Sequence, residues 1–363
     1  MRRREFIAGT AAMAAMGFAR PIGAQTNAQS TGVSRLAIFH PTEPPEGLTP
    51  NGRRSFKAYF GELNRLGHIE GQNLIVDRYS ALGQPDRIGE FAREIVASRP
   101  DAILEFSGPF IREVMAMNTG VPMIGTTADP VHFGFTTSLA RPDRNFTGVV
   151  VDAGLEIWGK RVQLLLEAAP KVKKLGLLDA NPTSPASGTR GYGANITEAA
   201  RRGGIAVAYA VVAGKFDRAA VERAGIFAAV IVGGDKVDRA ACEKTFDAME
   251  KEGVDGLMLT DPGEFLTHRQ LIADLAARFR VAAIYPYREF VEVGGLMSYG
   301  LDLADTMRRL AQVTVQVLGG AKPSDIPFYR QTKFELVLNQ KAATSLGLTF
   351  PAALLMTADE VID

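Results

Sequence analysis

Short apolar runs alternate with amphipathic stretches through the first half of the chain. Residues 53–67 place Phe56, Tyr59, Phe60 and Leu63 on one face of a helix, which Gly67 ends. The same reading predicts strands at 33–39, 72–80, 101–108 and 121–127, and further helices at 86–100 and 110–120. This β-α-β-α order predicts a parallel sheet with helices on both faces.

The alternation starts again after the segment 141–152. Helices are predicted at 155–170, 192–204, 238–253 and 264–279, and strands at 173–182, 205–212, 254–262 and 280–287. In the first of these helices Trp158 has the spacing of a core residue, so we expect it to pack in the core or between lobes. The fold class is therefore α/β, with two flavodoxin-like units joined near residue 148.

The last part of the chain predicts a hinge. Residues 294–320 form a strand and a helix, and 322–339 form an extended segment; both are too short for an independent core. Segments that pass back between two lobes favour closure about a ligand. We expect lobe one at 33–148 plus 294–321, and lobe two at 149–293 plus 322–363.

The N-terminus has the features of an export signal. Arg2, Arg3 and Arg4 precede the uncharged stretch 7–19, which is shorter than the about 20 residues that span a bilayer. We place cleavage near Ala24, so residues 1–24 are expected to be removed. The arginines resemble a twin-arginine signal, and an ordinary secretory signal is the alternative.

Composition and charge argue against several classes of function. The chain has 363 residues, of which 46% are hydrophobic, and its net charge is +1. Without the first 24 residues the net charge is −2, so no basic field for nucleic acid remains. Cys242 is the single cysteine and is expected to be a packed thiol. The four histidines, His40, His68, His132 and His268, lack metal-ligand spacing, and no cofactor is expected.

Two short apolar runs, VPMI at 121–124 and DGLML at 255–259, are each followed by threonine and then Asp-Pro, as in GTTADPV and LTDPG. Asp followed by Pro is typical of a helix N-terminus, and capping alone would explain one copy. Two copies at equivalent places also indicate the strand ends where open α/β sheets bind ligands. These loops supply the candidate ligand-binding residues: His40, Thr42, Ser107, Gly108, Thr126, Thr127 and Asp129 in lobe one, and Asn181, Asp261, Tyr285 and Tyr287 in lobe two.

The residue types indicate roles for these candidates. Ser107-Gly108 and Thr126-Thr127 would suit a carboxylate, because hydroxyls and free N–H groups at helix N-termini attract anions. Asp129 or Asp261 would hold an ammonium group, although one of them would then be only an N-cap. Tyr285 and Tyr287 are either ligand contacts or core and hinge tyrosines. Arg288 and Glu289 are expected to pair near the hinge.

Several separate motifs resemble one protein family. They are MRRREF at the N-terminus, GHIEGQNLIVDRY at 67–79, DPVHFGFTTSLARPDRNFTGV at 129–149, YPYREFVEVGGLMSYG at 285–300 and the ending from 332 to 362. Together they resemble the periplasmic substrate-binding component of ABC transporters, in a subgroup related to tryptophan- and tyrosine-binding lipoprotein homologues. The resemblance covers about residues 33–362 and implies a type I periplasmic binding fold with three crossovers and no enzymatic activity.

Two segments depart from the family pattern. The first loop, HPTEPPEGLTPNG at 40–52, has several prolines and two acids where the family usually has small residues, and the segment 213–235 is longer than expected. Both departures concern the identity of the ligand rather than the fold.

The resulting functional hypothesis is capture of a small solute and its delivery to an inner-membrane permease. The solute is expected to carry a carboxylate and to be amino-acid-like or aromatic, and the protein is expected to be a periplasmic monomer. A ligand sensor for a receptor is one alternative. An enzyme on an α/β fold is the second, although no nucleophile elbow, P-loop or dinucleotide fingerprint is present.

Overall fold

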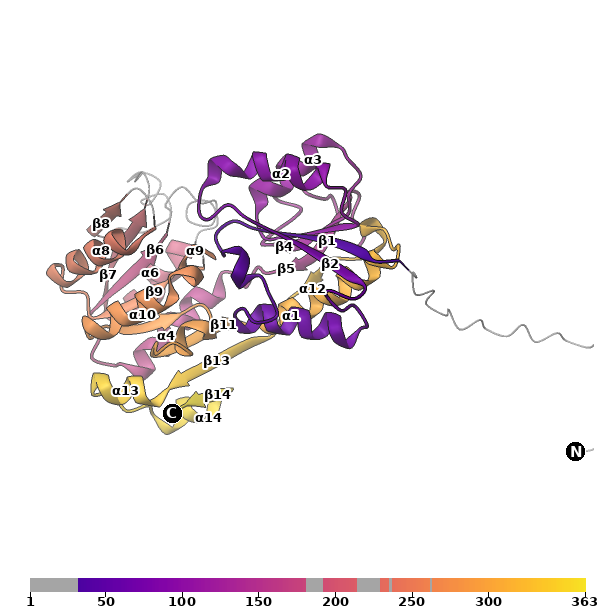
Figure 1. Cartoon of the computed structure of the whole chain (residues 1–363). Helices are drawn as coiled ribbons and strands as arrows, with labels where there is room; N and C mark the ends of the chain where they lie inside the picture. Colours follow the sequence, from indigo (N-terminus) through magenta and orange to yellow (C-terminus); the bar gives the residue numbers. More distant parts are fainter. Residues whose placement is uncertain (1–31, 181–191, 214–228, 235–236, 262) are drawn as a thin grey trace, which may run out of the picture.

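The computed structural model describes residues 32–180, 192–213, 229–234, 237–261 and 263–363, and these form two α/β lobes (Figure 1). Lobe one is built on a six-stranded sheet in the order β12-β5-β4-β3-β1-β2, and lobe two on an eight-stranded sheet in the order β14-β13-β11-β10-β9-β6-β7-β8. The export signal expected at 1–24 lies outside the described residues. No described helix has both the length and the apolar content needed to cross a membrane.

Lobe one has helices on both faces of its sheet. Its strands are β1 Ser34–His40, β2 Leu74–Ser80, β3 Ala102–Glu105, β4 Met123–Thr127, β5 Phe146–Val150 and β12 Tyr329–Arg330, and its helices are α1 Arg54–Arg65, α2 Ile88–Ala97, α3 Gly108–Met117 and α12 Leu303–Leu318. On β1, Leu36 and Ile38 pack toward α1 and α12, whereas Ala37 and Phe39 pack toward α2 and α3. Because side chains alternate along a strand, a continuous apolar run buries both faces of the sheet.

Lobe two repeats this arrangement. Its strands are β6 Lys174–Asp179, β7 Ala206–Ala213, β8 Ala229–Gly234, β9 Gly256–Leu259, β10 Ala282–Tyr285, β11 Met297–Leu301, β13 Phe334–Asn339 and β14 Glu360–Ile362, and its helices are α4 Glu156–Ala168, α6 Tyr192–Arg202, α8 Arg239–Lys251, α9 Gly263–Thr267, α10 Arg269–Arg278, α11 Arg288–Val291, α13 Gln340–Leu346 and α14 Ala352–Thr357. On β9, Met258 faces the core under α4, and Leu257 and Leu259 face the core under α8 and α10. β13 runs antiparallel to β11, and all the other pairs in this sheet are parallel.

The chain crosses between the sheets three times, at places that differ from the expected lobe boundaries. The first crossover follows Val150, so the expected boundary at 148 falls inside β5. β11 pairs with β10 in lobe two, although 294–321 was expected in lobe one, and the second crossover follows Leu301. β12 pairs with β5 in lobe one, so the third crossover lies at 331–333 rather than at 322. Pairing between distant strands decides these boundaries, and local periodicity does not report it.

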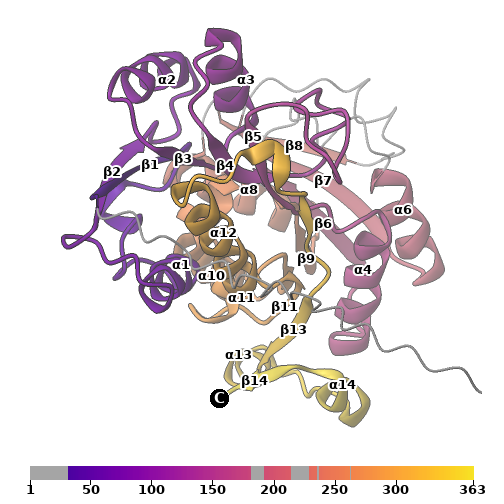
Figure 2. The same ribbon diagram turned by 90° about the vertical axis from the view of Figure 1, so that its right-hand side faces the viewer.

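After the second crossover, α12 packs against α1 and so belongs to lobe one. α12 lies beside α1 in both views (Figures 1 and 2), and the hydroxyls of Tyr59 and Thr314 are 2.9 Å apart between them. Leu310 and Val313 of α12 enter the same core as α1. The helix that leaves lobe two is therefore an integral part of lobe one.

Two local predictions differ from the structure. The single helix predicted at 264–279 is divided into α9 and α10, which meet at His268. The long segment at 213–235 contains β8 at the edge of the sheet; residues 214–228 and 235 lie outside the described part.

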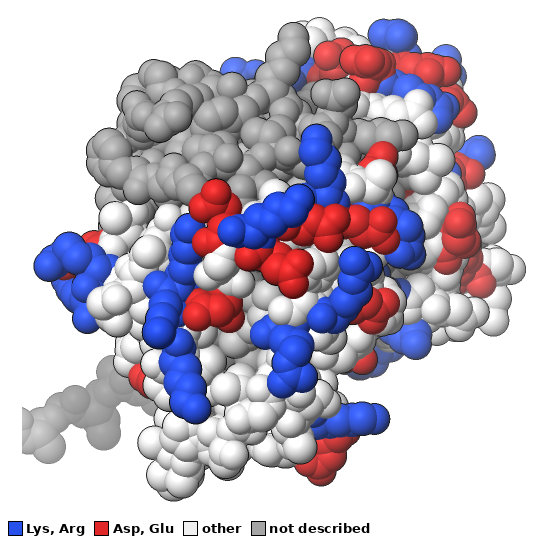
Figure 3. All heavy atoms as spheres, turned by 90° about the vertical axis from the view of Figure 1, so that its left-hand side faces the viewer, with Lys and Arg blue, Asp and Glu red and all other residues white. Residues whose placement is uncertain are grey.

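On the face of lobe two drawn in Figure 3, the described Lys and Arg side chains lie among Asp and Glu.

Candidate functional site

A cavity of about 460 Å³ lies between the lobes. Residues at the carboxyl ends of β1, β3 and β4 form one wall, and residues that follow β9 and β10 form the other. Leu301, Leu303, Thr306 and Met307 also line the cavity. Seven of the expected residues line it: His40, Thr42, Ser107, Gly108, Thr126, Asp261 and Tyr287. Their contact with a ligand stays a prediction.

His40, at the end of β1, presents one hydrogen-bond donor to the cavity. Its Nδ1 accepts hydrogen bonds from the backbone N–H groups of Thr42 at 3.1 Å and Glu43 at 2.8 Å, which places the ring proton on Nε2. Burial lowers the pKa of His40 well below 6.5, and the nearby Arg53 lowers it further. His40 is therefore a neutral donor near neutral pH rather than a cation.

The start of α3 supplies fewer free donors than expected. The Ser107 N–H donates to Glu105 Oε2 at 2.6 Å, and Ser107 Oγ caps the helix by accepting from the Phe110 N–H at 3.4 Å. The next residue but one, Pro109, has no N–H. The Gly108 N–H remains to bind a ligand, at the positive end of the helix dipole.

Glu105 holds this helix start in place from beneath. It is fully buried, and this burial raises the pKa of its carboxyl well above 4.5. Its side chain lies over β4, where a Cβ on Gly125 would collide with the Glu105 carboxylate. Glycine at 125 is therefore required by the close approach of Glu105 rather than by its own backbone angles.

Arg53 is a charged residue of the cavity wall that the sequence reasoning missed. Its Nη1 is 2.9 Å from Glu43 Oε2, its Nε donates to Ser55 Oγ at 3.0 Å, and it lies over the Phe56 ring. A signal was available: Arg53 begins the helix after β1, where a cation is unfavourable because of the helix dipole. A residue placed against a local preference often serves a site.

Two carboxyl groups lie on the lobe-two wall, and one of them is paired with a buried arginine. Asp261 Oδ1 is 2.6 Å from Arg161 Nη1, and Asp261 keeps 33% of its side chain exposed whereas Arg161 keeps 1%. Glu264 also lines the cavity, and burial raises the pKa of its carboxyl, with a further rise from the charge of Asp179. Tyr287 donates its hydroxyl proton to the Asp261 carbonyl at 3.2 Å.

The lobes touch directly beside the cavity. Thr267 Oγ1 of lobe two donates to Thr42 Oγ1 of lobe one at 3.3 Å. This contact and the cavity lining show that the two walls are already close in the structure.

The chain matches a family described as ABC transporter substrate binding protein over residues 58–222 and 241–362. The chain belongs to this family. Substrate-binding proteins of this kind bind small molecules and deliver them to ABC permeases, typically outside the cytoplasm. The resemblance read from the motifs is thus confirmed. No curated protein matches the chain.

Solved structures of related proteins agree on the fold. A conserved domain protein from Vibrio cholerae has a TM-score of 0.71 and 21% identity, over 91% of this chain and 99% of its own. An ABC domain from Streptococcus pneumoniae in complex with L-Trp has a TM-score of 0.66 and 21% identity, over 91% and 99%. A 5-methylthioribose transporter solute-binding protein from Thermotoga lettingae has a TM-score of 0.55 and 13% identity, over 89% and 95%. The substrate-binding protein described here therefore has the type I periplasmic binding fold.

Three of the expected site residues that the structure describes do not line the cavity of this substrate-binding protein. Thr127 follows Thr126 on β4 and points to the other face, because side chains alternate along a strand. Asp129 Oδ1 accepts from the backbone N–H groups of Val131 and His132, which matches the capping alternative. Tyr285 is fully buried and stacks on Phe290 at 4.8 Å, so it is a core tyrosine. Asn181 lies outside the described residues.

Three other expectations have clear outcomes. Arg288 does not pair with Glu289; its guanidinium instead contacts Glu292, Glu335 and Glu360 at 2.8–3.1 Å. Trp158 packs beside the lobe-two core, with Arg161 5.0 Å above its ring. Cys242 is buried, as expected for a structural thiol. Among the residues that the structure describes, no group of His, Cys, Asp and Glu side chains could hold a metal.

Proposed function

We propose that this protein captures a small carboxylate-bearing solute, amino-acid-like or aromatic, between its lobes and delivers it chemically unchanged to a permease. The observation that carries the proposal is the opposite character of the two cavity walls. Lobe one offers the donors His40 Nε2–H and Gly108 N–H, and lobe two offers the carboxylates of Asp261 and Glu264. A molecule with a carboxylate at one end and an ammonium at the other complements both walls.

The size and the apolar lining of the cavity support this class of ligand. A volume of about 460 Å³ lies within the roughly 300–1,000 Å³ range of small-molecule sites. Phe106, Leu301, Leu303 and Met307 also line it and would contact an apolar side chain. The L-Trp bound by the Streptococcus pneumoniae protein is consistent with an amino-acid-like ligand.

The cellular setting is part of the same proposal. The arginine-rich N-terminus and its apolar stretch support export to the periplasm, by the twin-arginine route or by the ordinary secretory route. A monomer would suit delivery to a permease, and no catalytic role is proposed for any cavity residue.

Thermal-shift screening of amino acids, aromatic acids and sugars, followed by calorimetry, tests this function. Thr126→Val and Thr127→Val form a matched pair, because only Thr126 lines the cavity. Thr126→Val should weaken binding of the best compound by about tenfold, and Thr127→Val should leave its affinity unchanged. Equal affinities in both variants, or recovery of a chemically altered compound, would contradict the proposal.

A further inference from the structure

Four buried polar atoms without a hydrogen bond to another residue gather where the lobes meet. Within the described part of the chain, these are Arg54 Nη1, Glu335 Oε1 and both carboxylate oxygens of Glu289. Arg54 lies on α1 of lobe one, whereas Glu289 and Glu335 lie on α11 and β13 of lobe two. Buried polar atoms in native proteins are nearly always bonded, so their concentration at one boundary between lobes requires an explanation.

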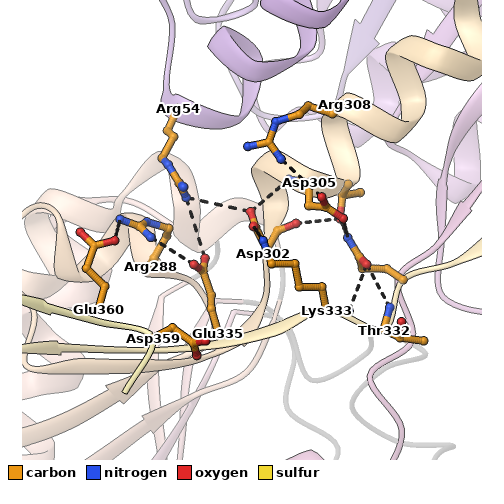
Figure 4. A network of polar contacts seen from close by, with 12 residues as sticks. Arg54, Arg288, Asp302, Asp305, Arg308, Thr332, Lys333, Glu335, Asp359 and Glu360 are labelled. Carbon is orange, nitrogen blue, oxygen red and sulfur yellow. Dashed lines mark hydrogen bonds and ion pairs between the residues drawn. The ribbon is translucent and has the colours of Figure 1, made fainter. Parts of the chain in front are cut away.

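Arg54 makes two long contacts at this boundary, one with Glu335 of lobe two and one with Asp302 at the start of α12. Arg54 Nη1 is 3.9 Å from Glu335 Oε1 and 4.0 Å from Asp302 Oδ1, and Figure 4 shows its guanidinium directed at both carboxylates. The same acids make short contacts with residues nearby in the hinge and lobe two: Glu335 Oε2 is 3.1 Å from Arg288 Nη1, and Asp302 Oδ2 is 2.9 Å from Lys333 Nζ. The Arg54–Glu335 contact, which joins the two lobes, is therefore longer than the contact that Glu335 makes with Arg288 inside lobe two.

Arg53 repeats this pattern nearer the cavity. Its short contacts, with Glu43 and Ser55, lie within lobe one. Across the boundary it faces Glu289. Burial raises the pKa of the Glu289 carboxyl, and the Arg53 charge lowers it in part. The two groups nevertheless form no ion pair within 4.0 Å. Glu289 is 1% exposed, so water offers its carboxylate little compensation.

The position of both arginines on α1 costs helix stability. Arg53 is the N-cap and Arg54 the first residue of α1, and the first turn contains no acidic residue. Cations at this end oppose the helix dipole. Two adjacent cations placed there are better explained by what they face than by the helix that carries them.

We propose that Arg53 and Arg54 form an electrostatic latch with Glu289 and Glu335, and that the latch tightens when the lobes close on a ligand. The inference rests on the lobe closure of the proposed function and deepens it. Arg53 lines one cavity wall, and Glu289 follows Tyr287 of the other wall by two residues, so approach of the walls shortens their separation. The latch stabilises the closed form and slows release of the ligand.

Distances between spin labels on the two lobes test the latch directly. Labels at Glu113→Cys on α3 and Lys244→Cys on α8 report the separation of the lobes, since both positions are exposed. Native Cys242 should stay unlabelled, because it is fully buried and burial raises the pKa of its thiol to about 11. The variants are Arg54→Gln and Glu289→Gln. The control is Arg65→Gln, which removes an exposed arginine of α1 that pairs only within lobe one.

In the ligand-free protein, both latch variants should reduce the population at the shorter distance by about fivefold. High salt should do the same to the wild type, and Arg65→Gln should match the wild type. Superimposable distance distributions for all four proteins, at low and high salt, would overturn the latch. This readout needs no ligand, so it fails or succeeds separately from the proposed function.

The kinetics of L-tryptophan binding, with L-tryptophan as the probe, give a second readout. If it binds, Arg54→Gln should raise its dissociation rate about fivefold and change its association rate less. Arg54→Lys should restore part of the loss, because the charge is kept while the forked geometry is not. If L-tryptophan binds, a dissociation rate that is the same in Arg54→Gln and in the wild type would contradict the latch. Absence of any tryptophan binding would count against the proposed ligand class alone.

Discussion

Replacing Asp261 by asparagine should destabilise lobe two more than replacing its partner Arg161 by methionine. The reason is the unequal burial of the pair, with 1% of the Arg161 side chain exposed against 33% for Asp261. Asp261→Asn leaves a buried guanidinium without its carboxylate, which costs about 3–5 kcal/mol in comparable cases. Because the asparagine oxygen can still accept one hydrogen bond, we expect about 3 kcal/mol.

Arg161→Met has a smaller cost for two physical reasons. The carboxylate it leaves behind faces the cavity, where water can solvate it, and the methionine still packs against Trp158. The variant loses the hydrogen bonds to Asp261 and to the Tyr299 carbonyl, so we expect about 1–2 kcal/mol. The double variant should be close to Arg161→Met alone, because asparagine strands no charge once the arginine is gone.

Urea unfolding followed by tryptophan fluorescence measures all three variants. Trp158 is the single tryptophan of the chain and lies 5.0 Å from the Arg161 guanidinium, so the signal reports lobe two. The reasoning would be refuted if Arg161→Met were the more destabilised single variant, or if the double variant lost the sum of the two single losses.

Three further predictions concern stability. Tyr285→Phe removes a buried hydroxyl without a partner among the described residues and should not lower the free energy of unfolding, whereas Tyr59→Phe breaks the 2.9 Å contact with Thr314 and should cost about 1 kcal/mol; similar urea-unfolding losses would count against this. Burial raises the pKa of Glu105 well above 4.5, so folding favours the protonated carboxyl, and the wild type loses stability as the pH rises above 4.5. Glutamine does not titrate, so the stability of Glu105→Gln relative to the wild type should increase from about pH 4 to pH 8 in thermal melts. A difference that does not change with pH would contradict this. Gly125→Ala forces its methyl group against the carboxylate and carbonyl of Glu105 and should cost about 1–3 kcal/mol; an unchanged melting temperature would show that the strand relaxes freely.

The sequence predicted the elements better than their membership of the two sheets. Alternating apolar and amphipathic stretches located β1 to β4 and the helices between them, because burial imposes these periods locally. The pattern could not show that β11 pairs with β10, or that β12 adds to the edge of lobe one beside β5. These short strands are placed by contacts with residues far away in the chain, which no local period records.

The candidate site was found by a rule about strand ends, and this rule has a definite limit. It located His40, Gly108 and Asp261, because each lies at or just after the carboxyl end of a parallel strand. It could not separate Tyr285 from Tyr287, because alternation places residues two apart on the same face of a strand. The two differ because β10 ends at Tyr285, whereas Tyr287 is the N-cap of α11. Nor could it show that the Ser107 N–H is occupied, since this depends on the protruding side chain of Glu105.

The most direct test of solute capture between the lobes is a crystal structure of the mature protein grown with the compound that gives the largest thermal shift. We predict that the compound lies between the lobes, with its carboxylate at the Gly108 N–H and His40 Nε2 and its cationic group at Asp261 or Glu264. A compound bound elsewhere on the molecule, with the space between the lobes filled only by solvent, would contradict the account.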